Sequence, residues 1–152
     1  MLQYQIKELS LDEFEHYENI WGKKENPEMI DHFFNQIKDG KRITFIYTEH
    51  DEFIGEGSLV FTHHESDYTI PNQRVYLSRM IVKEEHRNRG IGGVMLDYLI
   101  EKAKLLGYKE ISLGVDTNNF NARHLYEKKG FTDVIFEGED EYGEYVKLLK
   151  RL

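Results

Sequence analysis

A glycine-rich turn between an apolar stretch and an amphipathic stretch constrains this chain more than any other feature. The turn, residues 87–93, reads Arg-Asn-Arg-Gly-Ile-Gly-Gly. It follows residues 74–82, whose apolar and β-branched side chains predict a strand. After it, apolar residues recur at helical spacing up to Gly107, which predicts a long helix over 90–107. This order favours a mixed sheet, antiparallel at first and parallel where that helix crosses over.

The turn has the composition of a phosphate-binding site. A helix start presents unpaired amides and the positive end of the helix dipole, which suit an anion. Gly90, Gly92 and Gly93 let a bulky anion approach because no Cβ stands in the way. Arg87 and Arg89 add charged donors. The Gly-Lys-Ser/Thr of a Walker loop is missing, and the glycine spacing differs from the dinucleotide fingerprint. The alternative is that the glycines only relieve helix-to-sheet packing.

A second segment, residues 119–131, reads NFNARHLYEKKGF and follows the next predicted strand, 109–115. Together the two segments resemble the GNAT superfamily of N-acetyltransferases. The turn matches the pattern R-x-x-G-x-G, and the second segment matches N-x-x-A-x-x-x-Y-x-x-x-G-F without a gap. The resemblance covers residues 74–131 closely and the whole chain in the order of its elements.

The resemblance implies a fold, a reaction and a co-substrate. The fold is an α+β, GNAT-like mixed sheet of about seven strands flanked by about four helices, with the central strands parallel and splayed around the cofactor. A single N-acetyltransferase domain would occupy residues 1–152. It would move an acetyl group from acetyl-CoA to a primary amine, by direct attack in a ternary complex.

The resemblance also implies roles for particular residues. The backbone of Met80, Ile81 and Val82 would pair with the pantetheine arm as an added strand does. Asn119 would hydrogen-bond the same arm, and Tyr126 would be the catalytic acid that protonates the departing CoA thiolate. The CoA pyrophosphate would be held by the amides of Asn88, Arg89, Gly90, Ile91, Gly92 and Gly93.

Each of these roles has a structural alternative. Asn119 could be only the N-cap of its helix. The hydroxyl of Tyr126 could merely reach solvent. Lys128 and Lys129 could contact the CoA 3′-phosphate or form a solvated helix end.

The sequence departs from the family at the positions that would supply a base. Gly114 stands where relatives that acetylate protein N-termini commonly carry a glutamate. Tyr76 stands where several aminoglycoside-modifying relatives carry an acidic residue. The remaining candidates for the base are Glu56, Asp116, Ser78 or ordered water.

The N-terminal third predicts a strand and two helices. Residues 3–8 alternate as a short strand does. Ser10 and Glu13 form a capping box that begins a helix. Its apolar residues and its glycine end are Phe14, Tyr17, Ile20, Trp21 and Gly22. Asn26-Pro27 begins a second helix, which Gly40 ends. The buried stripe of this second helix would be Ile30, Phe33, Phe34 and Ile37.

Hairpins are predicted on both sides of the central elements. Residues 42–49 and 53–61 form the first, followed by a polar loop over 62–73. The last hairpin is predicted from strands 131–136 and 144–150 around an acidic turn, 137–144. A helix over 119–129, ended by Gly130, lies between the two hairpins.

The amino-acid composition bears on which classes of binding partner this chain can have. The net charge of −8 disfavours nucleic acid. It suits a small cationic amine acceptor, but plain solubility is the favoured explanation of the charge. The acidic segments 49–52 and 137–144 support such an acceptor only if they face the site. No apolar run approaches the roughly 18 residues that span a bilayer, and the N-terminus does not resemble a signal peptide. We therefore expect a cytoplasmic protein without a membrane partner, and a homodimer is left open.

No metal site is expected. Cysteine is absent, which removes thiolate ligands. His63 and His64 are adjacent, and adjacent side chains on an extended segment point in opposite directions. Two alternative functions remain at this stage. One is acetylation of a protein or peptide at lysine or the N-terminus, and the other is a non-catalytic module that binds acyl-CoA and regulates.

Overall fold

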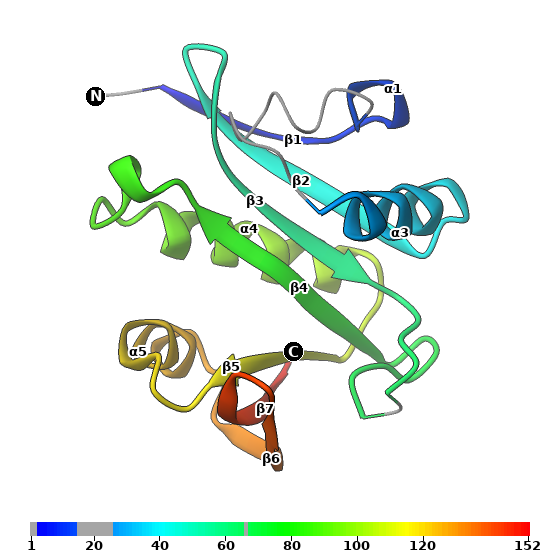
Figure 1. The fold of residues 1–152 in the computed structure, drawn as a ribbon, viewed down its shortest axis with the longest axis vertical. Helices are drawn as coiled ribbons and strands as arrows, with labels where there is room; N and C mark the ends of the chain where they lie inside the picture. The colour runs from blue at the N-terminus through cyan, green and yellow to red at the C-terminus, as the bar shows by residue number, and fades with distance from the viewer. Residues whose placement is uncertain (1–2, 15–25, 66) are drawn as a thin grey trace.

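The computed structural model describes residues 3–14, 26–65 and 67–152, which form one seven-stranded sheet with helices on both faces (Figure 1). The strands are β1 (Tyr4–Glu8), β2 (Arg42–Glu49), β3 (Glu52–Val60), β4 (Arg74–Val82), β5 (Glu110–Asp116), β6 (Asp133–Asp140) and β7 (Gly143–Arg151). The α-helices are α1 (Leu11–Phe14), α3 (Pro27–Lys38), α4 (Ile91–Leu105) and α5 (Phe120–Lys128). The predicted α+β class and the mixed sheet are confirmed.

The sheet runs in the order β1-β2-β3-β4-β5-β7-β6. All its neighbours are antiparallel except β4 and β5, which are parallel because the α4 crossover joins them. These two strands pair only at three positions, from Arg74↔Glu110 to Tyr76↔Ser112. Beyond them the strands part, and in the described part of the chain no strand pairs with residues 77–82 of β4 on the β5 side (Figure 1). This is the splay that the family resemblance predicts.

Alternating side chains on β2 join the sheet to its two layers of helices. Phe45 is 1% exposed and belongs to the main core, which lies under α4 with Leu96 and Leu99. Ile46, the next residue, is fully buried in a second cluster that contains Phe34 of α3. Helices α3 and α4 therefore cover opposite faces of the antiparallel half.

A bulge in β4 changes which side chains reach the α3 face. The register with β3 shifts between Glu56↔Ile81 and Ser58↔Ser78, so β4 holds one extra residue. Arg79 takes a positive φ of 53° there. Its guanidinium contacts the Glu56 carboxylate at 3.3 Å.

The predicted helix starts are confirmed where the structure describes them. The Ser10 N–H donates to Glu13 Oε1, and the Glu13 N–H donates to Ser10 Oγ, each at 3.1 Å. Asn26 Oδ1 accepts from the Glu28 amide at 2.9 Å, with Pro27 in the first turn. The predicted continuation of the first helix lies outside the described residues; it comprises Tyr17, Ile20, Trp21 and Gly22.

The prediction of a long acidic turn over 137–144 was wrong. Strands β6 and β7 pair without a break from Glu137↔Val146 to Asp140↔Gly143, so only residues 141–142 form the turn. The charges misled the prediction because β6 is an edge strand whose side chains are mostly exposed, so acidic residues fit there without burial. Gly143, with a φ of 118°, closes this tight hairpin.

We predict that Leu96→Ala lowers the free energy of unfolding by about 2–5 kcal/mol, because Leu96 is fully buried between α4 and the sheet. Leu105→Ala removes the same atoms from the end of the same helix, where the side chain is 77% exposed. It should change the free energy by no more than about 0.5 kcal/mol. Urea unfolding measures both. Equal losses in the two variants would contradict this account of the core.

Candidate active site

The glycine-rich turn leads into α4, and two of its residues have a left-handed backbone conformation. Asn88 has a φ of 64°, and Gly90, the N-cap of α4, has a φ of 81°. An N-cap glycine has no side chain to satisfy the first amides of the helix. The amides of the first turn, from Ile91 to Gly93, are therefore left to an external acceptor.

The two arginines of the turn anchor it to the sheet. Arg87 Nε donates to the Val82 carbonyl at 3.0 Å. Arg89 Nη2 donates to both carboxylate oxygens of Glu49, at 2.9 and 2.7 Å. This guanidinium holds the pKa of Glu49 below its usual range. Arg89 is thus already engaged by β2, and the acidic segment 49–52 borders the turn.

The last two glycines of the turn lie under α5. A Cβ on Gly92 would come within 3.4 Å of Leu125 Cδ2, and one on Gly93 within 3.7 Å of Lys129 Cε. Lys129 is bound to Asp97 of α4 at 2.9 Å. The nearest contacts at Gly92 and Gly93 are thus with α5 and the residue that follows it, whereas the alternative raised from the sequence was helix-to-sheet packing. The amides of the turn remain open to an anion.

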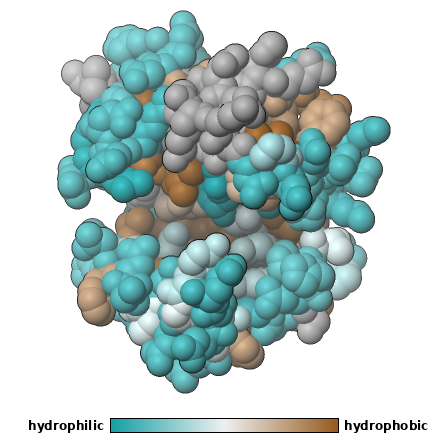
Figure 2. All heavy atoms as spheres, viewed as in Figure 1, coloured by the Kyte–Doolittle hydropathy of each residue, from teal (hydrophilic) through white to brown (hydrophobic). Residues whose placement is uncertain are grey.

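A cavity of about 490 Å³ lies where β4 and β5 part. Figure 2 shows the surface hollowed between the half that contains β1–β4 and the half that contains β5–β7. Four tyrosines and three carboxylates contribute to the wall of the cavity. The full lining is Glu65, Tyr68, Tyr76, Gly114, Val115, Asp116, Asn119, Ala122, Tyr126, Asp140 and Tyr145.

Two of the predicted site residues, one at the N-cap of α5 and one within α5, reach this cavity. Tyr126 is half-buried, with its ring centroid 6.0 Å from that of Phe131 in an edge-on contact. Burial, and then the proximity of Tyr76, raise the pKa of the Tyr126 phenol, so the hydroxyl keeps its proton at neutral pH. Asn119 Oδ1 accepts from the Ala122 amide at 3.2 Å, so Asn119 is the N-cap of α5 and also lines the cavity.

The candidates for the base are not brought together. Glu56 is 1% exposed and contacts Arg79 below α3, so its carboxylate is already paired. Ser78 is buried too, and its hydroxyl accepts from Arg42 Nη2 at 3.2 Å. Asp116 is exposed and lines the cavity with Tyr126. Among these three side chains, Asp116 is the one that lines the cavity.

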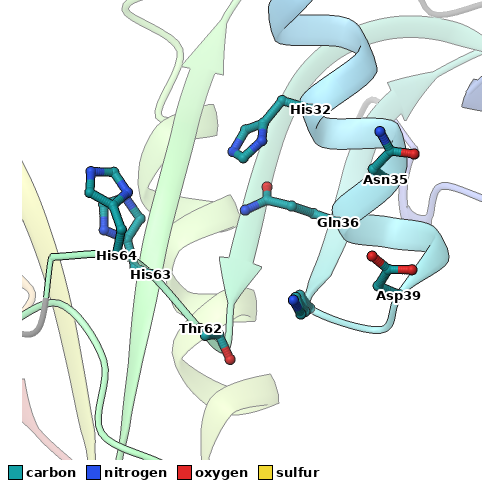
Figure 3. Close-up of a pocket in the computed structure, with 8 residues that line it drawn as sticks. His32, Asn35, Gln36, Asp39, Thr62, His63 and His64 are labelled. Carbon is teal, nitrogen blue, oxygen red and sulfur yellow. The ribbon is translucent and has the colours of Figure 1, made fainter.

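The expectation that His63 and His64 point in opposite directions was wrong. Their ring centroids lie 4.3 Å apart with planes inclined by 27°, because residues 62–65 do not form an extended strand. Ligand atoms of His63, His64 and Glu65 lie within 4.8 Å of one another. The Glu65 carboxylate is occupied by Lys147 Nζ at 2.9 Å. Figure 3 shows the two rings on the loop, across from His32 and Gln36 of α3. These four side chains line a hollow of about 420 Å³.

Sequence reasoning missed the contribution of the 62–73 loop. Tyr68 lies in the cavity wall, stacked on Tyr76 with ring centroids 4.1 Å apart. The loop has no hydrophobic periodicity that could have revealed this contact. The available signal was Gly114, since a Cβ there would overlap the Tyr68 hydroxyl.

Comparisons with known proteins agree with this geometry. The chain matches the Acetyltransferase (GNAT) family over residues 4–131. It is 35% identical over 89 residues to the spermine/spermidine N(1)-acetyltransferase of Bacillus subtilis (strain 168), which covers 58% of this chain and 57% of that protein. It is 34% identical over 89 residues to a probable spermine N(1)-acetyltransferase of Bacillus subtilis subsp. natto, with the same coverage. The matches thus span little more than half the length of these relatives.

Solved structures share the fold over almost the whole chain. An IAA acetyltransferase from Bacillus cereus superimposes with a TM-score of 0.77 at 16% identity, covering 99% of this chain and 100% of its own. A spermidine N-acetyltransferase from Vibrio cholerae, solved with CoA and spermine, gives 0.75 at 18% identity, covering 98% and 95%.

A mixed sheet splayed beside a glycine-rich helix start defines a GNAT-type fold. With the family match covering most of its length, the chain belongs to the Acetyltransferase (GNAT) family. None of the helices in the described part combines the length and apolar character needed to cross a membrane.

We predict that Gly92→Val raises the Kd for CoA by about tenfold or more, because a branched side chain blocks approach to the turn amides. The shift of melting temperature with CoA concentration measures the Kd. The double variant Gly92→Val/Leu125→Ala removes the contact with α5 at 3.4 Å and serves as the control. It should bind CoA as weakly as the single variant. Full recovery of affinity in the double variant would show that the glycine serves packing alone.

Proposed function

We propose that this chain transfers an acetyl group from acetyl-CoA to a primary amine of a small cationic molecule. The observation that carries the proposal is the cavity at the splay, where Tyr126 shares a wall with the carboxylates of Asp116 and Asp140. Tyrosine faces attract cations, and carboxylates add charge complementarity in a confined space. Two Bacillus relatives named for spermine acetylation support a cationic acceptor.

The cofactor half of the proposal rests on the turn and on β4. The open amides of residues 91–93 would hold the CoA pyrophosphate, and the N-cap glycine leaves them accessible. The free side of β4 at Met80, Ile81 and Val82 would pair with the pantetheine arm. Both features point to the same splay, because residues 77–82 line it on the β4 side.

The acidic side chains of segment 137–144 line two different hollows. Asp140 lines the cavity with Tyr126. Glu137, Glu139 and Glu144 instead line a separate hollow with Arg123. Within this segment, Asp140 is the residue that supports a cationic acceptor in the cavity. Glu65 and Asp116 come from elsewhere in the chain.

The proposed reaction is a direct transfer. The lone pair of the neutral amine forms a bond to the thioester carbonyl carbon, and the bond from that carbon to sulfur breaks. Tyr126 gives its proton to the departing thiolate. The excess proton on the amine nitrogen leaves through Asp116 or through water in the cavity. A phenol with a raised pKa fits this role, because it holds its proton until the thiolate forms.

We predict that Tyr126→Phe lowers kcat by about 10²-fold, which corresponds to about 2.7 kcal/mol of barrier. The phenylalanine ring keeps the contact with Phe131, so the KM for acetyl-CoA should stay nearly constant. This pattern marks an interaction made only in the transition state. Steady-state kinetics with acetyl-CoA and spermidine measures both constants.

Tyr108→Phe is the matched control, because Tyr108 stacks on Phe61 away from the cavity. It should leave both constants unchanged. An unchanged kcat in Tyr126→Phe would assign the thiolate's proton to water or to another donor. A large rise in the KM for acetyl-CoA would instead show that the hydroxyl acts in the ground state.

A further inference from the structure

The described residues of the loop between β3 and β4, 62–65 and 67–73, are held against the β5 side of the splay by the following contacts. Arg74 Nη1 donates to the Asp67 carbonyl at 2.7 Å, and Ser112 Oγ donates to the Tyr68 carbonyl at 2.6 Å. Lys147 of β7 is 2% exposed, and its ammonium contacts the carboxylates of Glu65 at 2.9 Å and Asp67 at 2.8 Å. A buried ammonium needs such partners, so the loop and β7 depend on each other.

These contacts fix the ring of Tyr68. The side chain is 6% exposed and stacks on Tyr76 with planes inclined by 25°. Lys147 Nζ lies 4.3 Å from the ring centroid, within the range of a cation–π contact. His63 meets the same ring edge-on, with centroids 5.0 Å apart. A ring held on three sides points its hydroxyl in one direction.

The Tyr68 hydroxyl takes the place of a side chain on β5. A Cβ on Gly114 would overlap Tyr68 Oη, because it would lie closer than two atoms can approach. Any larger residue at 114 would therefore expel the phenol. This accounts for the departure noted in the sequence, since Gly114 makes room for a polar group that a loop supplies in place of β5.

The hydroxyl is available to a ligand. Across residues 3–14, 26–65 and 67–152, no side chain or backbone group is a hydrogen-bond partner of Tyr68 Oη, although Tyr68 lines the cavity with Tyr126 and Asp116. The hydroxyl oxygen is not one of the fully buried side-chain atoms that lack a partner, so it opens onto the cavity. Burial also raises the pKa of Tyr68, so the phenol stays neutral and is no base.

We propose that Tyr68 is an acceptor-binding residue, whose hydroxyl oxygen accepts a hydrogen bond from an N–H of the attacking amine. The bond leaves the nitrogen lone pair free to face the thioester. This inference rests on the proposed function and adds the residue that holds the acceptor nitrogen.

The first test replaces the hydroxyl alone. Tyr68→Phe keeps the stacked ring and should raise the KM for spermidine by about 5- to 10-fold, the effect of one lost hydrogen bond. The KM for acetyl-CoA and the CoA-induced rise in melting temperature should stay unchanged. Tyr108→Phe again serves as the control and should leave the KM for spermidine unchanged.

The second test uses the contact with Gly114. Gly114→Ala should raise the KM for spermidine at least as much as Tyr68→Phe, because the new methyl group displaces the phenol. In the Tyr68→Phe background the nearest ring carbon lies 3.4 Å from the new Cβ, which is tolerable. The same Gly114→Ala change should then have little further effect. Additive effects of the two substitutions would contradict the proposed contact.

The results of these experiments distinguish a failure of the Tyr68 role from a failure of the proposed function. If the wild-type protein transfers acetyl groups to spermidine and Tyr68→Phe does so with the same KM and kcat, the role of Tyr68 is overturned alone. If the wild-type protein binds CoA and acetylates no amine in a panel of polyamines, aminoglycosides and peptides, the proposed function falls and the role of Tyr68 falls with it.

Discussion

The early end of the β4–β5 ladder is the constraint on which the site depends. After Tyr76↔Ser112 the two parallel strands part, while β5 stays fully paired with β7 on its other side. The half-sheet formed by β5–β7 therefore turns away from β4 as a unit. The gap leaves a free backbone edge on β4 and opens a cavity of about 490 Å³.

Segments from both halves of the sheet lie beside the gap, and an ion pair holds each segment in place. The turn before α4 is held to β2 by Arg89 and Glu49 at 2.7 Å. The 62–73 loop is held to β7 by Lys147, and α5 is joined to α4 by Lys129 and Asp97. Partly buried pairs of this kind fix geometry more than they add stability. The result is a cavity whose opposite walls belong to segments far apart in sequence.

Local signals explain what the sequence could predict. The turn and the 119–131 segment carry their information within a few residues, and so do the caps at Ser10 and Asn26. Contacts between distant residues carry no such signal. Arg89 looked free for a phosphate because Glu49 is 40 positions away in the chain. Tyr68 looked like a loop residue because its stacking on Tyr76 depends on how the loop folds back.

The central claim is that the cavity brings acetyl-CoA and a cationic amine together for transfer. Its most direct test follows free thiol after acetyl-CoA and spermidine are mixed with the protein, while mass spectrometry follows the amine. The account predicts thiol and N-acetylspermidine in equal amounts, well above the rate without protein. Binding of CoA without acetylated product, across spermidine and other cationic amines, would contradict it.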